Sequence, residues 1–139
     1  MSFRVRPSQP EDASVITSLL ASLGYELTED QIIEELNAHT STVVFVAEDD
    51  SQVIGFIAAN TRRQLHLAGR VTTIDSFVVD ESRRSEGIGK LLLNEVISHA
   101  QERGSKLVDV HSNTARDDAK RFYEGNGFVH SSNYFKMIL

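Results

Sequence analysis

The chain has 139 residues, of which 40% are hydrophobic and 24% are charged, and its formal net charge is −6. These values are typical of one globular domain, so we expect a single domain over residues 1–139. The absence of cysteine excludes a disulfide framework, a thiolate zinc site and a cysteine nucleophile. An acidic chain is a poor candidate for nucleic-acid binding, and we find no signal peptide or apolar run of membrane-spanning length. We therefore expect a soluble, cytoplasmic protein without nucleic-acid or membrane partners.

The N-terminal half predicts a strand, two helices and two further strands. Alternating residues predict a short strand over residues 3–6. Apolar residues at helical spacing predict a helix from residue 10 or 11 to Gly24, and Thr28 with Gln31 predicts a capping box at the start of a second helix. The β-branched runs of this half predict two strands joined by a tight turn, over residues 42–48 and 52–60.

The C-terminal half begins with residues 62–69, which we expect to form a polar loop. The elements predicted after it are a strand over 71–79, a helix over 87–103, a strand over 106–110, a helix over 115–124, and one or two strands from residue 128 onward. The long helix is expected to bury Ile88, Leu91, Leu92 and Val96. This order predicts an α/β fold with a mixed sheet of six or seven strands flanked by helices, in which residues 71–110 form a right-handed parallel crossover.

A turn with two glycines lies between the strand over 71–79 and the long helix. Gly87 and Gly89 let backbone N–H groups approach a ligand, and the first turn of a helix carries unpaired donors and a partial positive charge. This arrangement suits a pyrophosphate, and Arg84 adds a fork of donors. The residues predicted to bind the ligand are Arg84, Ser85, Glu86, Gly87, Ile88, Gly89 and Lys90. A turn that the glycines only shape remains the alternative.

Two common phosphate-binding loops are excluded at this turn. A Walker A loop needs glycine five residues before its Gly-Lys pair and serine or threonine after it, but these positions hold Arg84 and Leu91. A dinucleotide-binding fingerprint needs a third glycine at the position of Leu92.

The pattern Arg84-x-x-Gly87-x-Gly89, after the strand over 74–79 and before Lys90-Leu91-Leu92-Leu93, resembles the acetyl-CoA motif of the GNAT N-acetyltransferase superfamily. A second stretch, with Asn113 followed by Ala119, Tyr123 and Gly127-Phe128, resembles the later signature of that family. The resemblance implies a GNAT-like acyl-CoA N-acyltransferase fold and acetyl-CoA as co-substrate.

Two details refine the resemblance. The family often has a basic residue or glutamine at Glu86, and a carboxylate beside a pyrophosphate is unfavourable unless it points to solvent. The longer gap between Asn113 and Ala119 is similar to the branch that includes aminoalkylphosphonate N-acetyltransferases.

The resemblance also implies roles for individual residues. The backbone of Phe77, Val78 and Val79 would bind the pantetheine arm, and one N–H, of Phe77 or Val78, would polarise the acetyl carbonyl. Tyr123 would be the general acid, unless it is only a packed core tyrosine. Asp75 would be the general base, unless it is a sheet-face carboxylate that only attracts a cation.

Asn113 would contact the cofactor arm or an ordered water, and capping of the next helix is an equal alternative. His111 is a second candidate base. The histidines show no metal-ligand spacing, so no metal site is expected.

The predicted function is therefore transfer of an acetyl group from acetyl-CoA to a primary amine of a small molecule, by direct attack in a ternary complex. The alternatives are a non-catalytic acyl-CoA-binding regulatory module and a peptide or protein N-acetyltransferase. We expect the acceptor contacts in the Thr17–Asn37 helices and the Arg62–Arg70 loop, because such segments vary without breaking a fold. A homodimer is expected because relatives commonly dimerise.

Overall fold

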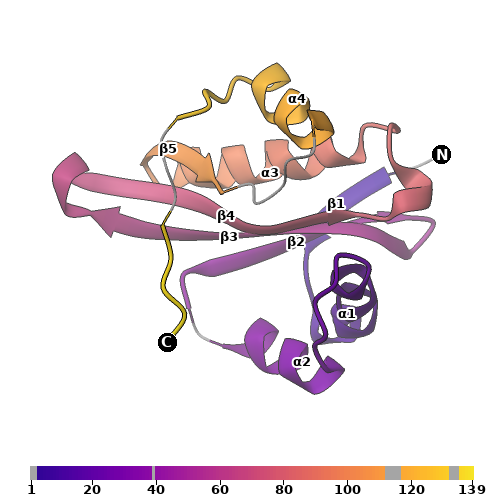
Figure 1. The fold of residues 1–139 in the computed structure, drawn as a ribbon. Helices are drawn as coiled ribbons and strands as arrows, with labels where there is room; N and C mark the ends of the chain where they lie inside the picture. The colour runs from indigo at the N-terminus through magenta and orange to yellow at the C-terminus, as the bar shows by residue number, and fades with distance from the viewer. Residues whose placement is uncertain (1–2, 39, 112–116, 132–134) are drawn as a thin grey trace.

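The architecture is a mixed sheet with helices on both faces, seen in a computed structural model that describes residues 3–38, 40–111, 117–131 and 135–139 (Figure 1). Its five strands follow chain order across the sheet: β1 (Phe3–Pro7), β2 (Thr42–Asp49), β3 (Gln52–Gln64), β4 (Gly69–Val79) and β5 (Ser105–Val110). The first four pair antiparallel, and β5 pairs parallel with β4. The predicted parallel crossover is therefore confirmed.

The four helices divide between the two faces of the sheet (Figure 1). One face carries α1 (Ala13–Ala21) and α2 (Glu29–Asn37), and the other carries α3 (Ile88–Glu102) and α4 (Asp117–Gly125). The capping box of α2 is confirmed: the Gln31 N–H donates to Thr28 Oγ1 at 3.1 Å, and the Thr28 N–H donates to Gln31 Oε1 at 2.8 Å. The predicted first helix begins as a 3₁₀ turn, Pro10–Asp12, and proline fits its first position because an N–H there would have no intrahelical acceptor.

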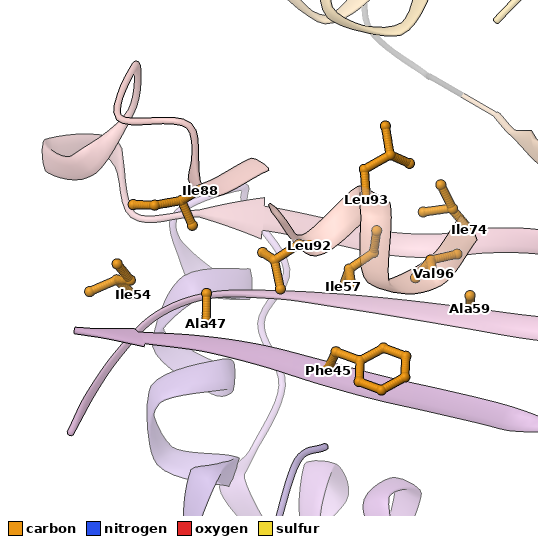
Figure 2. Close-up of a cluster of buried hydrophobic side chains, with 10 residues drawn as sticks. All are labelled: Phe45, Ala47, Ile54, Ile57, Ala59, Ile74, Ile88, Leu92, Leu93 and Val96. Carbon is orange, nitrogen blue, oxygen red and sulfur yellow. The ribbon is translucent and has the colours of Figure 1, made fainter. Parts of the chain in front are cut away.

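Each face of the sheet has its own core. Between the sheet and α3, side chains such as Ile57, Leu92 and Val96 are completely buried (Figure 2). On the opposite face, Ile16 and Phe56 belong to the cluster that joins α1 and α2 to the sheet. Strand residues therefore alternate between two apolar layers, as expected of a sheet covered on both sides.

Three details of the sequence prediction are wrong. The sheet has five strands in the described parts of the chain, because residues 126–131 and 135–139 form none despite apolar residues such as Phe135. Residues 62–64 extend β3 and pair with β4, so the expected loop shrinks to a 3₁₀ turn, Leu65–Leu67. In α3 the buried stripe contains Leu93 rather than Leu91, which is 41% exposed.

Candidate active site

The edge of β4 that faces β5 opens half-way along the strand. The two strands pair from Arg70 and Ser105 to Ile74 and Val110, where β5 ends. Beyond this point β4 pairs with β3 alone in the described parts of the chain. Backbone N–H and C=O groups on the open side need other partners, since strand polar groups are rarely left unpaired. The predicted backbone-binding residues Phe77, Val78 and Val79 lie in this segment.

Asp75 occupies a β-bulge where the two strands begin to diverge. In the β3–β4 register, Ala59 pairs with Ile74 and Ala58 with Ser76, which leaves Asp75 as the extra residue. A bulge re-aims a side chain relative to its neighbours. Partial desolvation raises the pKa of Asp75 above its ordinary value of 3.8, Arg62 opposes this shift, and Asp109 adds to it. A carboxylate with a raised pKa is a stronger base than an ordinary surface aspartate.

The glycine turn leads directly into α3. Ser85 and Gly87 have positive φ angles of 69° and 86°, and Gly87 caps the helix. The N–H groups of the first helical turn have no intrahelical acceptors and lie at the positive end of the helix dipole. Gly89 has a different role: a Cβ there would lie 3.4 Å from a ring carbon of Phe122 on α4. The turn therefore combines an anion-binding helix end with close packing against α4.

Glu86 interacts with an arginine. Arg83 Nε donates to Glu86 Oε2 at 3.0 Å, and Arg83 Nη2 donates to Asp49 Oδ2 at 2.6 Å. The Glu86 carboxylate is thus neutralised, and Glu86 is the only residue of the predicted segment 84–90 that does not line the groove described below. Sequence reasoning missed Arg83 as the partner, although its i, i+3 spacing from Glu86 was a usable signal.

Tyr123 lies in an aromatic cluster on α4. Its ring packs edge-to-face on Phe122 and Phe128, with centroid distances of 5.4 and 5.3 Å, and Phe122 packs on Phe77 of β4 at 5.8 Å. Burial raises the pKa of Tyr123 above its ordinary value of 10.0. The phenol is therefore protonated at neutral pH and available as a proton donor.

A single groove of about 1060 Å³ connects these features. It runs from α1 and α2, past β4, to the glycine turn and α4. The predicted site residues that line it are Asp75, Phe77, Val78, Val79, Arg84, Ser85, Gly87, Ile88, Gly89, Lys90 and Tyr123. His111 lines it as well, and Asn113 lies outside the described residues. Segments far apart in sequence thus form one site.

Residues 13–128 match the acetyltransferase (GNAT) family. The chain belongs to this family. The match covers α1 through Phe128 and includes every predicted site residue. The resemblance drawn from the glycine turn and the Tyr123 stretch is therefore confirmed.

Several GNAT proteins are similar to this chain over most of its length. It is 30% identical over 103 residues to N-acetyltransferase 8B of Mus musculus, and the aligned region covers 74% of this chain and 44% of that protein. It is 31% identical over 90 residues to the aminoalkylphosphonate N-acetyltransferase of Salmonella typhimurium, and the aligned region covers 65% of this chain and 58% of that protein. The chain thus spans about half the length of these relatives.

Solved structures show the same fold. A transcriptional regulator from Bacillus halodurans C-125 superposes with a TM-score of 0.88 at 23% identity, over 99% of this chain and 100% of the other. An aminoglycoside acetyltransferase from an uncultured soil metagenomic sample superposes with a TM-score of 0.80 at 18% identity, over 100% of this chain and 99% of the other. These likenesses establish the GNAT fold of the chain.

Two further observations concern other kinds of site. Within the described ranges of this GNAT chain, no group of histidine, aspartate and glutamate side chains has the geometry to hold a metal ion. No helix in those ranges is both long enough and apolar enough to cross a bilayer.

Proposed function

We propose that this protein transfers an acetyl group from acetyl-CoA to a primary amine of a small molecule, by direct attack while both substrates are bound. The observation that carries the proposal is the groove that joins the open edge of β4, the N-terminus of α3, Asp75 and Tyr123. GNAT enzymes use acetyl-CoA as the acetyl donor. The groove volume of about 1060 Å³ is at the upper end of the roughly 300–1000 Å³ of ordinary ligand pockets. It therefore has room for the reactive ends of two substrates.

The glycine turn and β4 suit the donor. The first-turn N–H groups of α3 and the Arg84 guanidinium offer hydrogen bonds and positive charge to a pyrophosphate. The open edge of β4 at Phe77–Val79 offers backbone donors and acceptors to the amide-containing pantetheine arm. An N–H of Phe77 or Val78 polarises the acetyl carbonyl in the manner of an oxyanion hole.

Asp75 and Tyr123 supply the proton transfers. An alkyl amine has a pKa of about 10.4 and arrives as an ammonium ion. Asp75 accepts one proton, directly or through water, so that the nitrogen lone pair can form a bond to the acetyl carbon. As the C–S bond breaks, the nitrogen loses its second proton to solvent, and Tyr123 donates its phenolic proton to the departing sulfur and regains one from solvent. Asp75 then releases to solvent the proton that it accepted. The net products are an amide, coenzyme A thiol and one proton.

Acetyl transfer is tested by incubating the protein with acetyl-CoA and a panel of primary amines, and by measuring thiol release. The variant Tyr123→Phe keeps the ring contacts with Phe122 and Phe128 but removes the acid. We expect its kcat to fall about a hundredfold, at the low end of general acid–base contributions, because a thiolate is a moderately good leaving group. The KM for acetyl-CoA should stay the same, since the hydroxyl is not assigned to cofactor binding.

The outcomes separate the functional classes. Binding of acetyl-CoA without transfer to any amine would identify a non-catalytic acyl-CoA-binding module. The absence of both acetyl-CoA binding and acetyl transfer would refute the proposal entirely. Transfer that is unchanged in Tyr123→Phe would remove Tyr123 as the acid but leave the acetyltransferase intact.

A further inference from the structure

The groove has a different electrostatic character at its two ends. In the described residues, its lining lysine and arginine residues all lie at or next to the glycine turn: Arg84, Lys90, and Arg83, which is paired with Glu86 and Asp49. The other end, between the sheet and the pair α1 and α2, has no lysine or arginine in its lining among residues 3–38 and 40–111, but it has the carboxylates of Glu35 and Asp75. A third lining carboxylate, Asp118, lies on α4. The cationic end suits the phosphates of the donor, so the end near α1 and α2 is left for the acceptor.

The walls of this acceptor end are apolar. The helices contribute Leu20, Ile32 and Leu36, and the strands contribute Val44 and Phe56. Such a lining favours a hydrocarbon surface, because transfer of apolar area from water stabilises the complex in proportion to that area.

Three large apolar side chains stand exposed at the connection between α1 and α2. Leu23 is 37% exposed, Tyr25 55% and Leu27 42%, and all three line the groove. Apolar side chains grouped at the rim of a cavity are characteristic of a binding site. None of the residues 62–70 lines the groove, so the expected contribution of that segment to the acceptor site is not found.

We propose that the acceptor is a primary amine on an uncharged, apolar body, such as an alkylamine or an arylalkylamine. This inference rests on the proposed acetyltransferase function. The ammonium group binds at Asp75 and the hydrocarbon part lies along α1, α2 and the Tyr25–Leu27 rim. An acceptor with a phosphonate or carboxylate would place an unpaired anion on an apolar wall near Glu35, which is unfavourable. The preference of the aminoalkylphosphonate N-acetyltransferase relative therefore does not extend to this chain.

The inference is tested with matched amines at saturating acetyl-CoA. The apolar series is n-butylamine, n-hexylamine and 2-phenylethylamine, and the charged comparators are 2-aminoethylphosphonate, β-alanine and putrescine. We expect kcat/KM to rise about two- to fourfold per methylene, the upper value being that of a fully buried methylene. The value for 2-phenylethylamine should exceed that for 2-aminoethylphosphonate by about a hundredfold, which corresponds to an anion left without a partner.

Two leucine variants test whether the preference for apolar amines arises at the Tyr25–Leu27 rim. Leu27→Ala should lower kcat/KM for 2-phenylethylamine about three- to tenfold by lost apolar contact, without changing the KM for acetyl-CoA. Leu65→Ala is the control, because Leu65 is 98% exposed and lies outside the groove lining. This variant should behave as the wild type.

Two results would overturn the inference while leaving the proposed function in place. One is a higher kcat/KM for 2-aminoethylphosphonate, β-alanine or putrescine than for the apolar series. The other is a kcat/KM that does not depend on chain length. The proposed function itself fails if no amine of either series is acetylated, and calorimetry with acetyl-CoA then shows whether the protein is a non-catalytic acyl-CoA-binding module.

Discussion

The pKa of Asp75 is raised mainly by desolvation and is then adjusted by two opposite charges, those of Arg62 and Asp109. Arg62 Nη1 donates to Thr73 Oγ1 at 2.6 Å, and the same hydroxyl donates to Asp109 Oδ1 at 2.5 Å. After desolvation, which is the main cause of its raised pKa, Asp75 is influenced by the Arg62 cation and the Asp109 anion in opposite directions. The two charges belong to one hydrogen-bonded chain, and asparagine at position 109 keeps an acceptor for the Thr73 hydroxyl while it removes the charge.

This arrangement predicts opposite pH shifts for two conservative variants. A base acts in its ionised form, so kcat falls as the pH drops through the pKa of Asp75. Arg62→Gln removes the cation that lowers this pKa, and the acidic limb of kcat should move to higher pH. Asp109→Asn removes the anion that raises it, and the limb should move to lower pH. Each shift should be about a few tenths of a unit to one unit.

The measurement is kcat against pH for both variants and for Asp75→Asn, which should lose the acidic limb. The role of Asp75 as base would be contradicted if kcat fell at the same acidic pH in all three variants. It would also be contradicted if Arg62→Gln and Asp109→Asn shifted that pH in the same direction.

At the scale of elements, Arg83 connects the glycine turn to the end of β2. It binds Glu86 within the turn and Asp49 on β2, and its guanidinium lies 5.8 Å from the Phe3 ring on β1. These hydrogen bonds hold the pKa of Arg83 above its ordinary value, first through Glu86 and then through Asp49. Arg83 is therefore a positioning residue that fixes the turn and neutralises the carboxylate nearest to the proposed phosphate site.

A double-mutant cycle tests this role. Arg83→Ala leaves the Glu86 charge uncompensated and should weaken acetyl-CoA binding about tenfold, which is the effect of about 1.4 kcal/mol, with little change in kcat. Glu86→Ala alone should bind normally, and Arg83→Ala/Glu86→Ala should bind more tightly than Arg83→Ala. Calorimetry with acetyl-CoA gives the three affinities. Equal weakening in Arg83→Ala and the double variant would show that Arg83 acts without Glu86.

A second ion-pair cluster fixes β1 to the start of α1. Arg6 donates to both oxygens of Asp12 at 2.9 Å and to Glu48 Oε2 at 3.0 Å. Burial alone would raise the pKa of Asp12, but hydrogen bonds from Arg6 and from the Gln9 backbone lower it below its ordinary value. The pair contributes stability that is present above the unfolded-state pKa of about 3.9 and is lost as the pH falls through the lower folded-state value.

Removal of one partner should therefore be costly. Arg6→Met leaves the Asp12 side chain, which is only 7% exposed, without its cation. We expect a loss of about 3 kcal/mol in the free energy of unfolding at neutral pH, and a smaller loss below about pH 4. Arg4→Met is the control, because its pair with Glu48 is 3.7 Å long and Arg4 is 71% exposed, so it should cost less than about 1 kcal/mol. Urea unfolding measures the free energy of unfolding of both variants. Equal losses in Arg6→Met and Arg4→Met would contradict a special stabilising role of the Arg6–Asp12 pair.

For the whole molecule, local patterns predicted most elements and the mixed sheet with its parallel crossover, but not the number of strands or the contacts between distant side chains. Periodicity and capping residues such as Thr28 fixed helices and strands, because these signals depend only on near neighbours. Residues 128–131 and 135–139 form no strand where one or two were expected, because a strand needs a partner as well as apolar residues. The glycine turn and Tyr123 were recognised from local motifs. The bond from Arg83 to Asp49 and the apolar acceptor end depend on contacts between distant segments, which no local pattern encodes.

The path of the groove across the molecule leads to a prediction about the kinetic mechanism of the proposed reaction. Its cationic end lies at α3 and its apolar end at α1 and α2, with Asp75 and the open edge of β4 between them. In the proposed reaction, donor and acceptor occupy separate ends of the groove and meet at β4. The chain also contains no cysteine that could carry the acetyl group between two half-reactions.

We therefore expect sequential kinetics. Initial rates at several fixed concentrations of 2-phenylethylamine should give intersecting lines in double-reciprocal plots against acetyl-CoA. Acetyl-CoA alone should release no stoichiometric burst of thiol, and mass spectrometry of the protein after this incubation should show no added acetyl group. Parallel lines with an acetylated protein would indicate a covalent intermediate instead.

Because a substrate that binds only the folded state stabilises it, acetyl-CoA at about 100 times its Kd should also add about 2.7 kcal/mol to the free energy of unfolding without any amine present. That result would show that the donor end of the groove is formed before the acceptor binds.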